Sequence, residues 1–248
     1  MADATLDGLS APSLAAQLGL SACEVYECVG STMDLAHEAA GRGVAADTLI
    51  IANAQDAGRG RGGRRWSSPA GGGLWMTLIE RPSSASGLDV LSLRVGLHVA
   101  EAIEPLAVAP VRLKWPNDLF VGEGKLAGIL IEARWHDRRV EWVAIGLGLN
   151  IVPPRDVTPA AGLAPGVTRV QALQRIIPAL RTAAAGEGPL TAEELSRFAA
   201  RDLSVGRLAS APAVGVVAGI AATGELMVDT DAGPLACRSG SLVFSEER

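Results

Sequence analysis

Two long apolar segments, 126–135 and 140–151, are separated by only the polar residues His136 to Arg139. Each segment is rich in strand-forming residues, and so short a connection joins antiparallel neighbours. Segment 111–115 has the same character and ends at Pro116, which cannot continue a strand ladder. The sequence therefore predicts an antiparallel meander of these three strands.

Further elements are predicted on both sides of this meander. Helical spacing or capping signals mark four helices, and apolar runs mark two more strands. The helices are expected at 31–43, 90–102, 170–180 and 191–202, with Ser31/Asp34 and Thr191/Glu194 as candidate capping boxes, and the strands at 48–53 and 74–79. Short alternating segments broken by glycine turns follow residue 204 and predict a small all-β barrel of about four or five strands.

Composition limits the class of protein. The chain has 248 residues, 48% of them apolar, and a net charge of −5, which disfavours general binding to nucleic acid or to an acidic membrane surface. No signal peptide is recognised, and no apolar run approaches the ~20 residues of a membrane span. Three cysteines without a CxxC motif fit a reducing cytoplasm, and three scattered histidines disfavour a zinc site or a catalytic triad. We expect a cytoplasmic protein.

Lysine is confined to one short segment. Only two of the 22 basic residues are lysine, Lys114 and Lys125. A lysine ammonium is a compact charge on a flexible stem, whereas arginine presents a broad planar fork. The bias therefore predicts a site that needs a compact cation beside a crowded anion. Codon preference combined with chance is the alternative.

Residues 58–63, Gly-Arg-Gly-Arg-Gly-Gly, match the GxGxxG pattern. A dinucleotide-binding domain requires a helix directly after this motif, but Arg64-Arg65-Trp66-Ser-Ser-Pro is a poor helix start. We predict a mobile anion-binding loop, whose glycines let the backbone approach phosphate and whose arginines donate bidentate hydrogen bonds. A solvated surface loop and an RNA-binding loop are the alternatives.

The lysine segment combines a strand end with a turn. Asn117 and Asp118 follow Pro116, where they are placed to bind ribose, phosphate or Mg²⁺. A hairpin over residues 122–124 then returns the chain to Lys125, which brings Lys125 close to Lys114. An ordinary hairpin with exposed lysines is the alternative.

Four motifs in sequence order carry a family resemblance. They are Gly58 to Trp66, Lys114 to Asp118, Lys125 to Glu132 and Gly146 to Asn150. Over residues 31 to about 151, their order and spacing resemble biotin protein ligase. The resemblance implies an α+β fold: a class II synthetase-like catalytic domain over 1–202, with a mixed, largely antiparallel central sheet and helices, and a small SH3-like β-barrel over 203–248. The segment before Ser31 is too short for the DNA-binding winged helix of some members, so we expect the short form.

The resemblance also implies an activity. Such a ligase uses ATP and Mg²⁺ to convert biotin into biotinyl-5′-AMP and pyrophosphate, and then transfers biotin to one lysine of a biotin carboxyl carrier domain. A site for this reaction needs no protein nucleophile, because it must neutralise and align two anions and exclude water. No side chain is assigned as a direct ligand of Mg²⁺.

Site residues follow from the same resemblance. Lys125, Arg61 and Lys114 are the expected catalytic charges. The expected biotin site comprises Ser31, Thr32, Gln55, Arg59, Gly60, Arg61 and Lys125. The expected nucleotide site comprises Arg64, Trp66, Lys114, Asn117, Asp118 and Asn150. Taken alone, Ser31 and Thr32 favour a simple helix cap over a binding role.

One position departs from the family pattern. Met33 stands where the family usually has asparagine after the Ser-Thr pair, which puts one polar contact in doubt. Three rivals stay open: a lipoate ligase or acyltransferase of the same superfamily, an RNA-binding protein that uses the Arg-Gly loop, and a biotin sensor without ATP turnover. The oligomeric state is open between a monomer and a weak homodimer.

Overall fold

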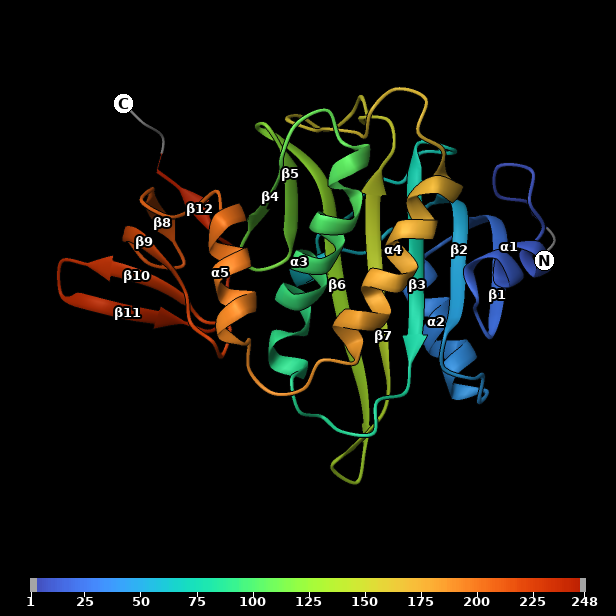
Figure 1. The fold of residues 1–248 in the computed structure, drawn as a ribbon, viewed down its shortest axis with the longest axis horizontal. Coiled ribbons are helices and arrows are strands. Elements are labelled where there is room, and N and C mark those ends of the chain that lie inside the picture. Colours follow the sequence, from blue (N-terminus) through green and yellow to red (C-terminus); the bar gives the residue numbers. More distant parts are fainter. Residues whose placement is uncertain (1–3, 246–248) are drawn as a thin grey trace.

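A seven-stranded sheet forms the centre of the computed structural model, which describes residues 4–245 (Figure 1). The strand order is β1–β2–β3–β7–β6–β5–β4; β1 and β2 are parallel, and all other neighbours are antiparallel. The strands are β1 (Ala22–Val29), β2 (Thr48–Gln55), β3 (Gly73–Glu80), β4 (Val111–Lys114), β5 (Asp118–Val121), β6 (Gly124–His136) and β7 (Arg139–Asn150). The expected α+β class with a largely antiparallel central sheet is confirmed.

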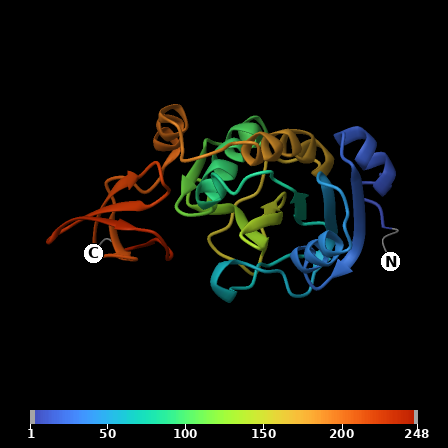
Figure 2. The same cartoon turned by 90° about the horizontal axis from the view of Figure 1, so that it is seen from below.

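Helices cover the two faces of this sheet unequally. Three helices, α1 (Ala11–Leu18), α3 (Leu91–Ile103) and α4 (Arg169–Ala184), lie on one face, and α2 (Thr32–Gly41) lies on the other (Figures 1 and 2). Successive side chains of a strand point to opposite faces. Accordingly, Leu49 and Ile51 of β2 join the large core under α3 and α4, whereas Ile50 packs in a small cluster with alanines of α2.

Most predicted elements are present, and the meander needs one correction. All the strands and helices predicted between residues 31 and 202 appear within a few residues of their expected bounds, and the hairpin over 122–124 is confirmed. However, β4 does not pair with β6, because the four residues of β5 lie between them. The helix α1 and the strand β1 were not predicted.

The two predicted capping boxes differ in outcome. Thr191 and Glu194 form both reciprocal bonds of the box at the start of α5 (Ala192–Arg201). At the start of α2, the Ser31 hydroxyl accepts from the Met33 N–H, whereas the Asp34 carboxylate binds Arg59 instead. The box expected at Ser31 is therefore only a single cap.

A second sheet of five strands follows α5 and lies beyond the β4 edge of the central sheet (Figures 1 and 2). Its strand order is β11–β10–β9–β8–β12. The strands are β8 (Leu208–Ala211), β9 (Gly215–Ile220), β10 (Leu226–Thr230), β11 (Gly233–Cys237) and β12 (Val243–Phe244). Of the small all-β barrel predicted after residue 204, the all-β character and the five strands are confirmed, whereas closure into a barrel stays a prediction.

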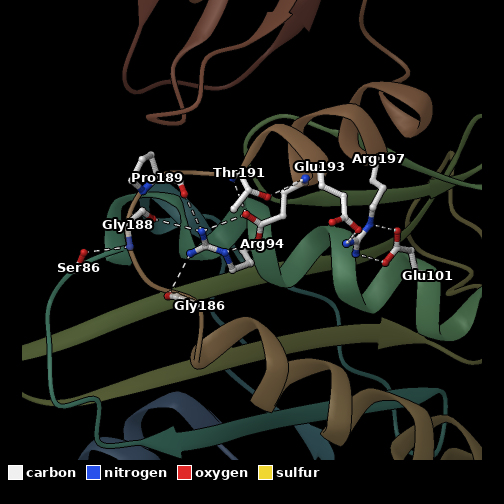
Figure 3. Close-up of polar contacts among 10 residues, drawn as sticks. Ser86, Arg94, Glu101, Gly186, Gly188, Pro189, Thr191, Glu193 and Arg197 are labelled. Carbon is white, nitrogen blue, oxygen red and sulfur yellow. Dashed lines mark hydrogen bonds and ion pairs between the residues drawn. The ribbon is translucent and has the colours of Figure 1, made fainter.

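Polar contacts fix the second sheet and α5 against β4 and α3. The Leu203 N–H donates to the Leu113 carbonyl at 3.0 Å, and the Trp115 indole donates to the Gly224 carbonyl at 3.0 Å. In α3, the Arg94 guanidinium pairs with Glu194 of α5 at 2.6 Å (Figure 3). The contacts of Leu113 and Trp115 flank Lys114 in sequence, so the position of this lysine depends on the C-terminal unit.

Within residues 4–245, no helix is long and apolar enough to cross a membrane.

Candidate active site

A cavity of about 350 Å³ opens on the sheet face that α2 covers. The residues that line it come from the α2 start, the glycine loop, strands β3 to β7 and the C-terminal unit. Of the predicted site residues, those at the cavity are Ser31, Thr32, Gln55, Arg59, Gly60, Arg61, Arg64, Trp66, Lys114, Asn117, Asp118 and Lys125. Asn150 lies outside the lining and donates to the Lys125 carbonyl at 3.1 Å, so it supports the strand that carries this lysine.

Glycines on β6 and β7 form the floor of the cavity. Gly128 and Gly148 are paired across the two strands, and the Trp66 ring lies against both. A Cβ atom at Gly148 would be 2.4 Å from the Trp66 Nε1, and a Cβ atom at Gly146 would be 2.7 Å from the Met33 Cε. Both distances are far below a carbon contact distance of about 3.5–4.0 Å. The glycines therefore give the ring and the thioether room to sit in the site.

Positive charge dominates the lining. Six cations line the cavity, namely Arg59, Arg61, Arg64, Arg65, Lys114 and Lys125, but the described lining holds a single carboxylate, that of Asp118. The Lys125 Nζ lies 2.8 Å from the Asp118 Oδ1 and 5.1 Å from the centroid of the Trp66 ring. Because the chain as a whole is acidic, this local excess indicates a site for an anionic ligand.

Burial disfavours the protonated form of two of these cations. Desolvation lowers the pKa of Lys114, and Lys125, Arg207 and Arg64 lower it further, against the opposing effect of Asp118. Burial likewise lowers the pKa of Arg61. An anion bound between these groups would favour their protonated forms and so offset the effects of desolvation and mutual repulsion.

The glycine loop forms a small hairpin. Arg59 and Arg65 pair in an antiparallel bridge, and the Gly60 N–H donates to the Arg64 carbonyl at 2.7 Å. A three-residue 3₁₀ turn at Arg61–Gly63 replaces the helix that a dinucleotide-binding motif requires. The loop therefore presents backbone groups and arginines to the cavity without a following helix.

At the opposite end of the site, polar groups gather around the start of α2. The Gln55 Oε1 accepts from the Thr32 N–H at 2.9 Å, and the Gln55 Nε2 donates to the Ser68 hydroxyl at 2.8 Å. The Thr32 hydroxyl also lies 3.0 Å from that of Thr77, which is fully buried. Together with Ser31, these groups offer both donors and acceptors to a neutral polar ligand end.

The C-terminal unit supplies lining residues that the sequence did not predict. Ser241 to Phe244 reach the cavity, and the Phe244 ring centroid lies 4.8 Å from the Lys114 Nζ. Arg64 donates to the Ser241 hydroxyl, and Arg61 donates to the Gly240 carbonyl at 3.5 Å. Only an aromatic residue after a Ser-Gly-Ser turn marks this segment in the sequence. Thr77 was also missed, because a lone threonine in an apolar strand carries no functional signal.

Comparison with known families decides the assignment of the chain. A model of the biotin/lipoate A/B protein ligase family matches residues 25–150, more than half of the chain. The chain belongs to this family. The matched region contains all thirteen residues predicted for the site, from Ser31 to Asn150, but not the lining segment 241–244.

Individual relatives agree with the family. The biotin–[acetyl-CoA-carboxylase] ligase of Paracoccus denitrificans is 38% identical over 130 residues, which cover 51% of this chain and 52% of the relative. The chain spans about half or less of the curated relatives that it matches, for example 41% of one from Bacillus spizizenii and 53% of one from Mycobacterium tuberculosis.

Two solved structures extend the likeness to most of the fold. The biotin protein ligase of Aquifex aeolicus in complex with biotin and ATP is 24% identical, with a TM-score of 0.73 over 92% of this chain and 100% of that one. The biotin protein ligase of Leishmania major in complex with biotinyl-5-AMP is 26% identical, with a TM-score of 0.59 over 90% and 98% of the two chains.

Proposed function

We propose that this protein is a biotin protein ligase that activates biotin with ATP and transfers it to a lysine of a carrier domain. The single observation that carries the proposal is the polarity of the cavity, which has neutral hydrogen-bonding groups at the α2 end and clustered cations at the Lys125 end. Biotin has a matching polarity, with a neutral ureido ring at one end and a carboxylate at the other. Family membership and relatives that bind biotin and ATP support the same assignment.

In the first half-reaction, the biotin carboxylate attacks the α-phosphorus of ATP, and pyrophosphate leaves. Lys125 lies between the two reacting anions and reduces their repulsion, while Lys114, Arg61 and Arg64 hold the phosphates. Fixed charges of this kind act most strongly in a site that excludes water. The product is biotinyl-5′-AMP, the ligand of the Leishmania major relative.

In the second half-reaction, the amine of a carrier lysine attacks the carbonyl carbon of the mixed anhydride. An amide bond forms, and AMP leaves with the electrons of the broken bond. A biotin carboxyl carrier domain of a carboxylase is the proposed acceptor, because the Paracoccus relative is named for such a substrate.

Mg²⁺ is proposed to enter with ATP. No cluster of three or more metal-ligating side chains exists among residues 4–245, and the one carboxylate of the lining, Asp118, already pairs with Lys125. The donor set therefore fits a metal held mainly by phosphate oxygens and water, as Mg²⁺ commonly is. When bound, the ion neutralises phosphate charge.

The domain division belongs to the same proposal. Residues 1–202 form the catalytic domain, and residues 203–248 correspond to the SH3-like domain of the family. The five-stranded sheet after α5 and its contacts with Lys114 and Arg64 support a C-terminal unit that completes the nucleotide end of the site.

Pyrophosphate release from ATP and Mg²⁺, without carrier, tests the function directly. We expect release with biotin and none with lipoate. Release with lipoate alone would move the chain to the lipoate branch of the family. Biotin binding without any pyrophosphate release would instead favour a sensor and overturn the assignment of Lys125.

A further inference from the structure

The Arg59 side chain makes contacts that set it apart from the other arginines of the glycine loop. Its two Nη atoms lie 2.7 Å from the Asp34 Oδ1 in α2 and 2.5 Å from the Glu132 Oε1 in β6. One guanidinium thus joins a helix and a strand that are about a hundred residues apart in sequence. Its charge is already balanced by two carboxylates, unlike that of the cations near Lys125.

Two further residues brace the Glu132 carboxylate. Its second oxygen lies 2.9 Å from the His37 Nε2, and the Trp142 indole Nε1 lies 2.9 Å from the His37 Nδ1. An indole N–H can only donate, so Nδ1 must be the unprotonated acceptor, and the proton of the neutral ring lies on Nε2. His37 therefore donates to Glu132, and the carboxylate is held from both sides.

The position of this cluster relates it to the biotin end of the site. Asp34 is two residues beyond Thr32 in the same helix, and Arg59 lines the cavity. Strands rise about 3.3 Å per residue, so Glu132 lies about 23 Å along β6 from Lys125, too far to take part in the chemistry there. A second open cavity is lined by the same loop, Asp56 to Arg65, and by Leu130 to Glu132. The loop thus borders two cavities, and Arg59 lines both of them.

The loop is held differently at its two ends. Arg61 and Arg64 contact Gly240 and Ser241 of the C-terminal unit, and these arginines are free to exchange their neutral partners for phosphates. Arg59 instead holds the α2 end through charged partners that no ligand has to replace. Charge-assisted bonds of this kind are stronger than neutral ones.

We propose that Asp34, His37, Arg59, Glu132 and Trp142 form a tether that keeps the loop closed over the ring end of biotin. In this tether, Asp34, His37 and Glu132 are positioning residues that act on bound biotin through Arg59. The inference rests on the proposed function for the identity of the ligand. The tether itself is independent of that function.

Glu132→Gln tests the tether, because it keeps the shape of the side chain and removes its charge. The side chains that pair with Glu132 are about one-third exposed, so a loss of affinity of about fivefold, equivalent to about 1 kcal/mol, is the expected scale. We expect faster dissociation of labelled biotin and a higher KM for biotin, with an unchanged KM for ATP. Asp34→Asn should likewise speed biotin dissociation and raise the KM for biotin. Because Asp34 is exposed, this substitution should leave the fold intact.

Two further variants serve as comparisons for Glu132→Gln. Glu141→Gln, on the exposed part of β7, removes a carboxylate that makes no ion pair among the described residues, and it should match the unaltered chain. Ser241→Ala weakens the other end of the loop, and it should raise the KM for ATP rather than that for biotin. Equal behaviour of Glu132→Gln and Glu141→Gln, or an equal rise of both KM values in Glu132→Gln, would overturn the tether.

Trypsin provides a readout that needs no ligand, because the loop contains four arginines between residues 59 and 65. Release of the tether should speed cleavage in Glu132→Gln relative to Glu141→Gln. Absence of biotin binding and of pyrophosphate release in the unaltered chain would overturn the proposed function. Trypsin cleavage would still test the tether in that case, so failure of the proposed function and failure of the tether are distinguishable.

Discussion

At the residue scale, Lys125 contacts a carboxylate, an aromatic ring and a side-chain amide. Its ammonium lies beside the Asp118 carboxylate and over the Trp66 ring, and its carbonyl accepts from Asn150. The backbone and the head group of this side chain are thus both fixed before a substrate arrives. Preorganised charges contribute most to catalysis, because they need no reorganisation during the reaction.

Lys125→Ala should therefore reduce the rate of biotin-dependent pyrophosphate release by about 10²- to 10³-fold, the usual scale for one preorganised group. Lys125→Arg should recover only part of this loss, because a broad planar guanidinium does not reproduce the compact charge of an ammonium. Single-turnover adenylate formation measures both. Near-normal adenylate formation by Lys125→Ala would contradict the assigned role.

Gly148 controls the space available to Trp66. Because an added Cβ would lie 2.4 Å from the Trp66 Nε1, Gly148→Ala must displace the ring or the strand, at a cost of about 1–3 kcal/mol. We expect a lower free energy of unfolding and a marked fall in kcat/KM for adenylation. Gly41→Ala is the control, since its Cβ meets nothing within 4 Å. Equal activity of the two variants would show that Trp66 has no role.

At the element scale, the sequence predicts local features better than the order in which elements pair. Apolar runs located β2, β3, β6 and β7, because these strands are long and bounded by turns. The short β5 follows directly after the Asn117 turn signal, so pattern alone did not separate it from that turn. The four site motifs are predictable because each lies in one continuous segment, whereas Ser241 to Phe244 reach the cavity only through contacts such as Trp115–Gly224.

The end of β3 carries a carboxyl group with a strongly altered pKa. Burial, and to a lesser extent nearby Asp47, together raise the pKa of Glu80 to about 7, while Arg181 of α4 acts in the opposite direction. Between the pKa of an unfolded glutamate and about 7, the folded chain therefore binds more protons than the unfolded chain. The free energy of unfolding should fall as the pH rises through this window.

Glu80→Gln should remove this pH dependence, because the amide does not titrate. Urea unfolding at pH 5 and pH 8 is the measurement, and the unaltered chain should lose more stability than Glu80→Gln between these values. Identical losses in the two proteins would show that Glu80 titrates normally.

At the scale of the whole molecule, the cavity is lined by both the central sheet and the C-terminal unit, so the proposed activity depends on a fixed relation between them. Lys114 of β4 packs on Phe244 of β12, and the glycine loop contacts Ser241. The site is therefore complete only while α5 remains seated on α3. Two ion pairs of very different burial connect these helices (Figure 3).

The buried pair, Arg94–Glu194, should dominate this connection. The Arg94 side chain is 2% exposed and also donates to three carbonyls of the segment before α5. Arg94→Met leaves Glu194 buried without its partner, and breaking such a pair costs about 3–5 kcal/mol. Arg197–Glu101 joins the same helices but is about one-third exposed, so Arg197→Met should cost at most about 1 kcal/mol.

A double-mutant cycle separates loss of the pair from loss of packing. Arg94→Met with Glu194→Met should be less destabilised than the sum of the two single variants, because no uncompensated charge remains. Urea unfolding of the unaltered chain and the three variants gives the four free energies of unfolding, and additive effects would contradict a direct pair. Since the proposed nucleotide end of the site depends on the seated C-terminal unit, we expect any single variant that still folds to show a raised KM for ATP before its KM for biotin changes.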